Sequence, residues 1–256
     1  MRLSLEIVAV HSRRPSTRVH IFFTEDHPVG HHAVVDGRQR QVRDVIERLT
    51  RRGTATARSD GSVHPLFPVA ASAAEGEDLR DWVVRVNAAR TIEIGLGYGI
   101  SALFVCEGLL AGGHVAPTHV VIDPYQATRF ADLGLQVLGE AGVADLVEHY
   151  AEESQIVLPR LLAAGESFDL AFVDGNHRFD WVFVDLFYLG RLVRPGGVIV
   201  VDDYQLPAIV RATSFFVANR DWTLESVSPD DDLHQWAVLR TATEPDTRPF
   251  TSFVDF

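Results

Sequence analysis

Short apolar runs begin to alternate with longer amphipathic stretches at about residue 91 of this 256-residue chain. The apolar runs have the length of buried strands, and the stretches between them have helical periodicity. The runs are 91–94, 119–122, 146–150, 168–173 and 198–201, and the helical stretches are about 100–111, 126–141, 154–164, 178–193 and 206–218. This alternation predicts an α/β fold in which a doubly wound parallel sheet carries helices on both faces.

The last part of the chain departs from this alternation. The segments "WTLESVS" (222–228) and "HQWAVLR" (234–240) are typical of two strands separated only by a turn. A hairpin cannot continue a parallel strand–helix–strand pattern, so at least one of these strands is expected to be antiparallel at the edge of the sheet. Together with the five runs above, they predict seven strands, most of them parallel.

The N-terminal part has a different pattern. Alternating or β-branched runs predict short strands, residues 53–65 have the composition of a loop, and two later stretches have the periodicity of helices. The strands are expected at 3–10, 19–24 and 33–36, and the helices at Gln41–Arg52 and Asp78–Ala89. Three short strands are too few to form a core of their own. We therefore divide the chain into a β-containing extension, 1–70, which serves as a substrate cover or an oligomer interface, and a domain, 71–256.

Composition excludes several classes of function. The formal net charge is −12, and the first 60 residues hold 11 arginines against 7 acidic residues, so the rest of the chain is more acidic still. Such a body repels phosphate, which argues against a nucleic-acid partner. The single cysteine allows no intrachain disulfide, and no run approaches the ~20 apolar residues of a membrane helix. We expect a cytoplasmic protein that binds neither nucleic acid nor membrane.

A glycine-rich loop follows the run 91–94, in the stretch "TIEIGLGYGIS". Gly95, Gly97 and Gly99 allow the backbone to approach a ligand closely, and the helix that follows favours an anionic group at its N-terminus. Glu93, two residues before the first glycine, repels a pyrophosphate but suits an ammonium group. A dinucleotide fingerprint would also place its third glycine one residue later. The loop therefore fits the methionine end of S-adenosylmethionine better than NAD.

Acidic and aromatic residues after the next two strands extend this predicted cofactor site. Asp123 closes the strand 119–122, where an acid accepts hydrogen bonds from ribose hydroxyls, or alternatively caps the helix that follows. Tyr125 covers the adenine or ribose, or only packs, and Glu152 or Glu153 lies near the adenine amino group. The full set predicted to bind the cofactor is Glu93, Gly95, Gly97, Tyr98, Gly99, Asp123, Tyr125, Glu152 and Asp174.

Two further strands end in carboxylates, in "FVDGNHRFDW" (172–181) and "GGVIVVDDYQ" (196–205). Ligands bind at the carboxyl ends of parallel strands, so Asp174, Asp202 and Asp203 are expected to converge beside the methyl group. Clustered carboxylates repel one another unless a cation joins them, and hard oxygen ligands of this kind suit Mg²⁺. The alternative is that these acids only cap the helix and the turn that follow them.

Residues ~75–240 resemble the class I S-adenosylmethionine-dependent methyltransferases. The resemblance rests on the E-x-G-x-G-x-G loop, the acid closing the second strand, "LVRPGGVIVVDD" and the terminal hairpin. The segments "VDGNHRFDWVFVDL" and "VVDDY" resemble more narrowly the small-molecule O-methyltransferases with a D-G-x-H motif, including relatives of the antibiotic and macrolide-sugar enzymes. The resemblance implies a Rossmann-like methyltransferase sheet, S-adenosylmethionine as cofactor, and the same three acids as metal ligands.

The residue that removes the substrate proton is a separate question. The resemblance implies a lysine near the metal in catechol-type relatives, but all 23 basic residues of this chain are arginines. His177, three residues after Asp174, is the available substitute and is expected to need little adjustment of its pKa. The alternative is a structural histidine bonded to the strand ends. Asn176 stands where some sugar O-methyltransferases carry an acid. We predict His177 and Asp174 as the catalytic pair.

These observations predict a methyltransferase that modifies a hydroxyl of a small molecule, such as a natural-product intermediate of secondary metabolism, with the assistance of Mg²⁺. We expect it to form a homo-oligomer. Three alternatives stay open: N-methylation without a metal, an NAD-dependent oxidoreductase, and a methyltransferase-like binding subunit without catalytic activity. The sequence does not name the methyl acceptor, because a fold does not determine its substrate.

Overall fold

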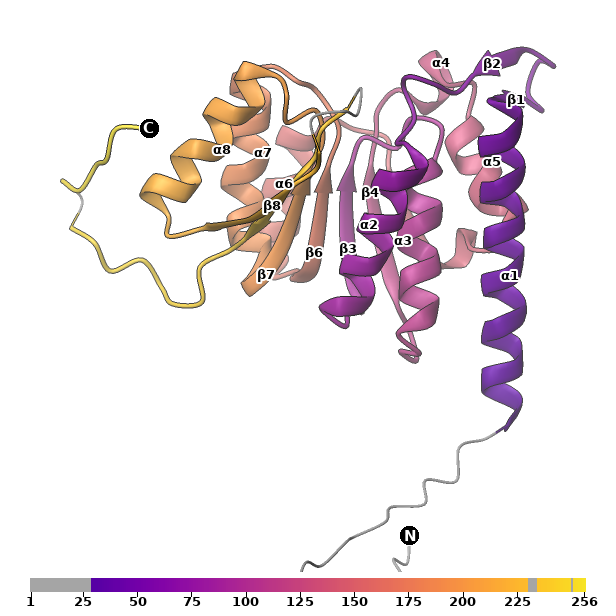
Figure 1. Ribbon diagram of the computed structural model, residues 1–256, viewed down its shortest axis with the longest axis horizontal. Coiled ribbons are helices and arrows are strands. Elements are labelled where there is room, and N and C mark those ends of the chain that lie inside the picture. Colours follow the sequence, from indigo (N-terminus) through magenta and orange to yellow (C-terminus); the bar gives the residue numbers. More distant parts are fainter. Residues whose placement is uncertain (1–28, 230–233, 250) are drawn as a thin grey trace, which may run out of the picture.

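A computed structural model describes residues 29–229, 234–249 and 251–256, with a seven-stranded sheet at its centre (Figure 1). The strand order is β5-β4-β3-β6-β7-β9-β8, and only β9 runs antiparallel to its neighbours. The predicted mostly parallel sheet and its C-terminal hairpin are therefore confirmed. The strands are β3 (Arg90–Ile94), β4 (Thr118–Ile122), β5 (Val147–Tyr150), β6 (Phe168–Val173), β7 (Val193–Val201), β8 (Thr223–Val227) and β9 (Ala237–Arg240).

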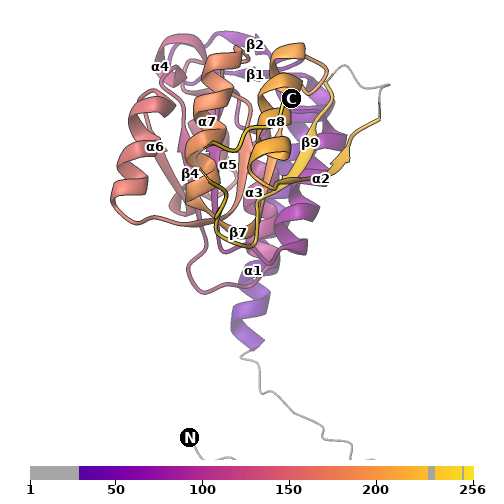
Figure 2. The same cartoon turned by 90° about the vertical axis from the view of Figure 1, so that its left-hand side faces the viewer.

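Helices cover both faces of this sheet, as the doubly wound pattern predicts (Figure 1, Figure 2). One face carries α2 (Ala73–Arg85), α3 (Ile100–Ala111) and α5 (Leu133–Glu140), with α1 (Val29–Arg52) packed outside on α3. The other face carries α6 (Ser154–Ala163), α7 (Phe179–Leu192) and α8 (Pro207–Asn219). Within the described residues, no helix is both long enough and apolar enough to cross a membrane.

The core explains why the strands have continuous apolar runs in the sequence. Successive side chains of a strand point to opposite faces, and here both faces are covered. Leu170 and Phe172 of β6 pack with the side chains of α2 and α3, whereas Ala171 and Val173 pack with those of α7 and α8. All but one position of each of the central strands β3, β4 and β6 is therefore buried, and no polar alternation marks a solvent face there.

The N-terminal region departs from the sequence-based expectation. Residues 33–36, predicted as a strand, belong to the helix α1, because extending a formed helix outweighs the β-propensity of a short Val-Val pair. The predicted loop 53–65 contains a hairpin of β1 (Thr54–Thr56) and β2 (Val63–Pro65). The strands predicted at 3–10 and 19–24 lie outside the described residues.

Two other helix boundaries differ from the prediction. The stretch 126–141 is divided into a short α4 (Gln126–Arg129) and α5, because Ala131 and Asp132 adopt left-handed backbone angles between them. The helix α2 begins at Ala73, earlier than expected, since Ser72 caps it by accepting a hydrogen bond from the Glu75 N–H at 3.1 Å. The sequence signal for this start is a capping box, Ser72-x-x-Glu75.

Close packing of α2 on α3 is tightest at Gly76 of α2. A Cβ atom at Gly76 would lie 2.1 Å from the Phe104 ring of α3. Any larger residue therefore forces the two helices apart or moves the ring, which is well buried. This contact fixes the first turn of α2 against the sheet, close to the ends of β6 and β7.

We predict that Gly76→Ala destabilises the fold by about 1–3 kcal/mol, because overpacking outweighs the gain in helix propensity. The matched control is Gly139→Ala in α5, where an added Cβ meets nothing within 4 Å. The control should stabilise the protein by about 0.5–1 kcal/mol. Chemical denaturation measures both changes, and equal effects of the two substitutions would contradict this account of the α2–α3 contact.

Candidate active site

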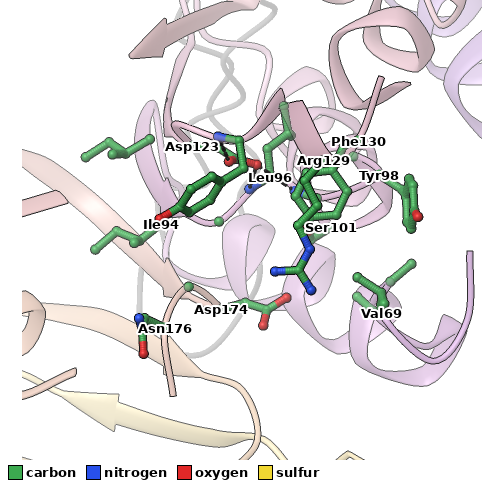
Figure 3. Close-up of a pocket in the computed structure, with 18 of the residues that line it drawn as sticks. Val69, Ile94, Leu96, Tyr98, Ser101, Asp123, Arg129, Phe130, Asp174 and Asn176 are labelled. Atoms are coloured by element: carbon green, nitrogen blue, oxygen red, sulfur yellow. Dashed lines mark hydrogen bonds between the residues drawn. The ribbon is translucent and has the colours of Figure 1, made fainter. Parts of the chain in front are cut away.

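A cavity of about 590 Å³ lies at the carboxyl ends of the parallel strands (Figure 3). Its walls come from the segment before α2, the glycine loop, the residues after β4, β5, β6 and β7, and the segment before β9. These walls include Pro68–Ala71, Gly95–Ser101, Asp123–Tyr125, Glu153, Ser154, Asp174–His177, Asp203 and His234. Its volume is in the range of small-molecule sites.

The three glycines of the loop line this cavity with left-handed φ angles of 92°, 51° and 81° for Gly95, Gly97 and Gly99. Residues with a side chain rarely adopt such angles. At Gly95 a Cβ atom would also lie 2.1 Å from the backbone oxygen of Asp174. This glycine therefore allows the loop after β3 to contact the end of β6 directly.

Glu93 lies behind the cavity wall, and its side chain is fully buried. Its carboxylate accepts a hydrogen bond from the Ser101 hydroxyl and lies 2.8 Å from His119 Nε2. Ser101, at the start of α3, lines the cavity. The predicted acid therefore reaches the cavity through Ser101, a residue that the sequence analysis did not identify.

Asp123 lines the cavity and connects β4 to the glycine loop. Its Oδ2 accepts hydrogen bonds from the N–H groups of Leu96 at 3.2 Å and Gly97 at 3.0 Å, and its Oδ1 accepts one from the Tyr125 N–H at 2.8 Å. The helix α4 has Tyr125 at its N-cap position, without a side-chain cap. The helix-capping alternative is therefore wrong, and the carboxylate instead holds the loop at the cavity.

The remaining cofactor candidates divide between the cavity and the surface. Tyr98 is buried with its ring edge-on to Phe130, the two centroids 5.2 Å apart. Tyr125 is 45% exposed, and its hydroxyl donates to Glu153 at 3.0 Å. Glu152 points away from the cavity, where it pairs with an arginine of α6, Arg160, at 2.6 Å. Its neighbour Glu153 is the acid that lines the wall.

The acids after β6 and β7 converge, as their positions at the strand ends predict. Asp203 Oδ2 lies 2.9 Å from His177 Nδ1, and His177 Nε2 lies 3.4 Å from Asp174 Oδ1. On its other side, Asp203 Oδ1 lies 3.0 Å from His234 Nδ1. Ligand atoms of Asp202, Asp203 and His234 all lie within 4.8 Å of one another. Two histidines therefore stand among three carboxylates.

A left-handed turn at Asp203 contributes to this convergence. Consecutive residues of an extended strand point in opposite directions. Asp203 has a φ angle of 54°, which breaks the alternation after Asp202 and lets both carboxylates approach the same centre. Such angles are unfavourable for a residue with a side chain and gather at functional sites.

The sequence analysis also missed one acid and one arginine near the cluster. Glu75, in the first turn of α2, is fully buried, and neither of its carboxylate oxygens has a hydrogen-bond partner. The Oδ1 atom of Asp202 is buried without a partner as well. Arg129 of α4 points its guanidinium group into the cavity toward Asp174 (Figure 3). Unpartnered buried oxygens and a set of hard ligands fit a divalent cation such as Mg²⁺.

Known proteins with similar sequences are methyltransferases. A family model described as "Methyltransferase domain" matches residues 92–204. A catechol O-methyltransferase of Mycobacterium tuberculosis is 34% identical over 149 residues, covering 58% of this chain and 62% of the relative. A probable caffeoyl-CoA O-methyltransferase of Arabidopsis thaliana is 28% identical over 178 residues, covering 68% and 66%. The matched regions thus span less than two thirds of each relative's length.

Solved structures share the fold. The O-methyltransferase TomG from Streptomyces achromogenes, in complex with SAM, has a TM-score of 0.61 at 22% identity, covering 79% of this chain and 89% of that one. An O-methyltransferase from Bacillus cereus, in complex with SAH, has a TM-score of 0.59 at 17% identity, covering 83% and 96%. Residues 92–204 thus match the methyltransferase domain family, and the comparisons support the resemblance to the class I S-adenosylmethionine-dependent methyltransferases. The alternative of an NAD-dependent oxidoreductase is accordingly not favoured.

The pKa of His177 in this methyltransferase site differs from the value expected from the sequence. Hydrogen bonds with Asp174 and Asp203 raise the pKa of His177 from 6.5 to about 10. The prediction that His177 needs little adjustment of its pKa is therefore wrong, because it sits between two carboxylates and not beside one. Burial alone would raise the pKa of Asp203, but the hydrogen bond and charge of His177, with hydrogen bonds from Gln205 and His234, together lower it to about 2.

The pKa values of the other acids of the methyltransferase site are raised, whereas that of Asp203 is lowered. Burial raises the pKa of Asp174 well above its usual range, against the hydrogen bond from His177. Burial, followed by the charge of Asp203, raises the pKa of Asp202. Burial, then the charges of Asp202 and Asp174, raises the pKa of Glu75 to about 10. Burial and mutual repulsion thus favour the protonated forms of Asp174, Asp202 and Glu75.

We predict that His177→Gln destabilises the metal-free methyltransferase most at pH 6 and progressively less toward pH 10. The raised pKa of His177 means that its contribution to stability is complete below its ordinary value of 6.5 and is lost as the pH rises through about 10. Thermal unfolding in EDTA across this range measures the difference between wild type and variant. In an Asp203→Asn background the same substitution should have a smaller effect, and a difference that does not change with pH would contradict the prediction.

Proposed function

We propose that this protein transfers a methyl group from S-adenosylmethionine to a hydroxyl group of a small molecule, with the help of a divalent cation. The observation that carries the proposal is that the glycine loop, Asp123, Asp174 and Asp203 all line one cavity, with the buried Asp202 beside Asp203. The relatives named above as O-methyltransferases support the type of reaction.

The proposed cofactor site follows the cavity wall. The three glycines and the N-terminus of α3, with Ser101 held by Glu93, take the methionine end, and Asp123 takes the ribose hydroxyls. Tyr125 and Glu153 lie beyond Asp123, on the side where an adenine would extend. This arrangement leaves the carboxylate cluster beside the methyl group.

In the proposed mechanism this chain supplies positioning, charge and a proton acceptor. Asp174, Asp202 and Asp203 would hold the cation, which would lower the pKa of an acceptor hydroxyl and orient it for in-line attack. His177 can accept a proton only in its neutral form. Its pKa is raised by Asp174 and Asp203, so positive charge added at those carboxylates lowers that pKa toward the range of a general base.

The acceptor class is proposed from the relatives and from this chemistry. A cation that binds two adjacent oxygens favours a catechol or another vicinal diol, which agrees with the catechol O-methyltransferase among the relatives. The absence of lysine from the chain assigns proton removal to His177. N-methylation without a metal is the second candidate, because a neutral histidine accepts a proton from an amine equally well.

The N-terminal extension, 1–70, is proposed to cover the acceptor side of this cavity. Pro68, Val69 and Ala70 are its last residues, and all three line the cavity wall. The β1–β2 hairpin lies at the same end of the molecule as the tips of the parallel strands (Figure 1). A homo-oligomer is proposed as well, because large apolar side chains such as Phe179 and Phe187 of α7 are 40% and 37% exposed.

The first test concerns the cofactor. Asp123→Ala should weaken the binding of S-adenosylhomocysteine by about 1–3 kcal/mol, because the ligand and the glycine loop both lose a charged acceptor. Glu152→Ala is the matched control and should bind as the wild type does, since Glu152 pairs with Arg160 outside the cavity. Isothermal titration calorimetry measures both, and unchanged affinity for Asp123→Ala would remove this residue from the site.

The second test concerns the reaction. Turnover of catechol with methyl-labelled S-adenosylmethionine should give a methoxy product, and excess EDTA should stop it while S-adenosylhomocysteine still binds. His177→Ala should lower kcat by about 10²–10⁴-fold. Full activity in EDTA would reject the cation, and labelled product from an amine but not from catechol would favour N-methylation.

A further inference from the structure

Glu75 has an environment that its position in the helix does not explain. It is the N3 residue of α2, and the N-cap residue Ser72 accepts a hydrogen bond from its N–H. In a capping box, the N3 glutamate carboxylate returns to the N-cap N–H. Here both carboxylate oxygens are buried and have no hydrogen-bond partner. The side chain therefore points into the protein instead of completing the cap.

The Glu75 side chain points toward the acids at the ends of β6 and β7. Asp202 and Asp174 are the charges that act most strongly on the Glu75 carboxyl. Asp202 is itself 5% exposed, and its Oδ1 also lacks a partner. Three buried carboxylate oxygens, two from α2 and one from the end of β7, thus receive no hydrogen bond from an N–H or hydroxyl group, and the carboxyl groups of Glu75 and Asp202 contact each other. Burial of such oxygens is unfavourable unless a cation or a donor joins them.

The position of Glu75 is fixed by packing on both sides. Gly76 lies against the Phe104 ring so closely that an added Cβ would be 2.1 Å from it. One turn along the helix, Asp78 accepts a hydrogen bond from Trp236 Nε1 of the segment before β9, at 2.7 Å. These contacts hold the first turn of α2 against the sheet, where the Glu75 carboxylate is shielded from water.

We propose that Glu75 is a ligand of the divalent cation, together with Asp202, so that α2 contributes a fourth carboxylate to the site. The inference deepens the proposed function and rests on it. A carboxylate oxygen from α2 completes a set of hard oxygen ligands of the kind that Mg²⁺ and Mn²⁺ bind. It also accounts for the three unpartnered oxygens, because a cation placed among them satisfies all of them at once.

The test compares the affinity of the full chain for Mn²⁺ and Mg²⁺, by isothermal titration calorimetry, among four proteins: wild type, Glu75→Gln, Glu77→Gln and Asp202→Asn. Glu77 lies two residues along α2 and is exposed, so its substitution removes the same charge outside the cluster. Glu75→Gln and Asp202→Asn should each bind the ions at least ~10-fold more weakly than wild type. Glu77→Gln should bind them as wild type does.

The alternative is that Glu75 is a neutral acid whose O–H donates to Asp202 and which never binds the ion. Glutamine has nearly the same size and keeps a donor, so Glu75→Gln would then bind Mn²⁺ with wild-type affinity, and this result would overturn the proposal. If the wild type and Asp202→Asn bind the ions equally weakly, the cation of the proposed function fails instead. The two failures are therefore distinguishable.

A second measurement shows whether a variant that loses metal affinity is still folded. Metal-free Glu75→Gln is expected to unfold at the wild-type temperature or above it, because the amide adds no charge to the interior. Binding of S-adenosylhomocysteine should be retained. If the variant does not fold, Glu75→Asp keeps the charge but withdraws the carboxylate by one methylene, and it should reduce the rise in Tm that Mg²⁺ produces. An undiminished rise would also contradict the proposal.

Discussion

Negative charge at the carboxyl ends of β6 and β7 is the constraint on which the rest of the site depends. Parallel strands end at the same edge of a sheet, so Asp174, Asp202 and Asp203 cannot avoid one another. Their repulsion is unfavourable in a partly buried site unless positive charge is present. Two histidines supply part of it, and the pKa of His177 rises to about 10 as a result. This edge of the sheet is therefore suited to bind a cation.

The glycine loop is in direct contact with the end of β6 and is hydrogen-bonded to the residue that follows β4. Gly95 contacts the backbone of Asp174 so closely that a Cβ atom would lie 2.1 Å from its oxygen. Asp123 in turn accepts the N–H groups of Leu96 and Gly97, which holds the loop against the end of β4. The part of the cavity that would hold the methyl donor and the part that would hold the acceptor are therefore placed by the same few contacts, as in-line transfer requires.

The absence of lysine changes how a proton can be removed in this site. A lysine beside a cation is an independent base, whereas His177 is hydrogen-bonded to the acids that would hold the ion. The proton affinity of His177 therefore depends on whether the charge of Asp174 and Asp203 is already compensated. In the proposed mechanism, proton removal and cation binding are therefore coupled through these two carboxylates.

The sequence alone determined the strands, the closing hairpin, the glycine loop and the acids at the strand ends, because each is written in a local pattern of apolar runs, glycines and carboxylates. It placed residues 33–36 in a strand, because local β-propensity is weak compared with the extension of a helix. It placed Glu152 at the cofactor, because the sequence does not show which of two adjacent acids faces the cavity. Only the tertiary structure put Ser101 in front of Glu93, gave His177 a second carboxylate partner, and brought Glu75 and His234 to the cluster. Those contacts join residues far apart in the chain, and the packing of α2 and the terminal hairpin on the sheet decides them.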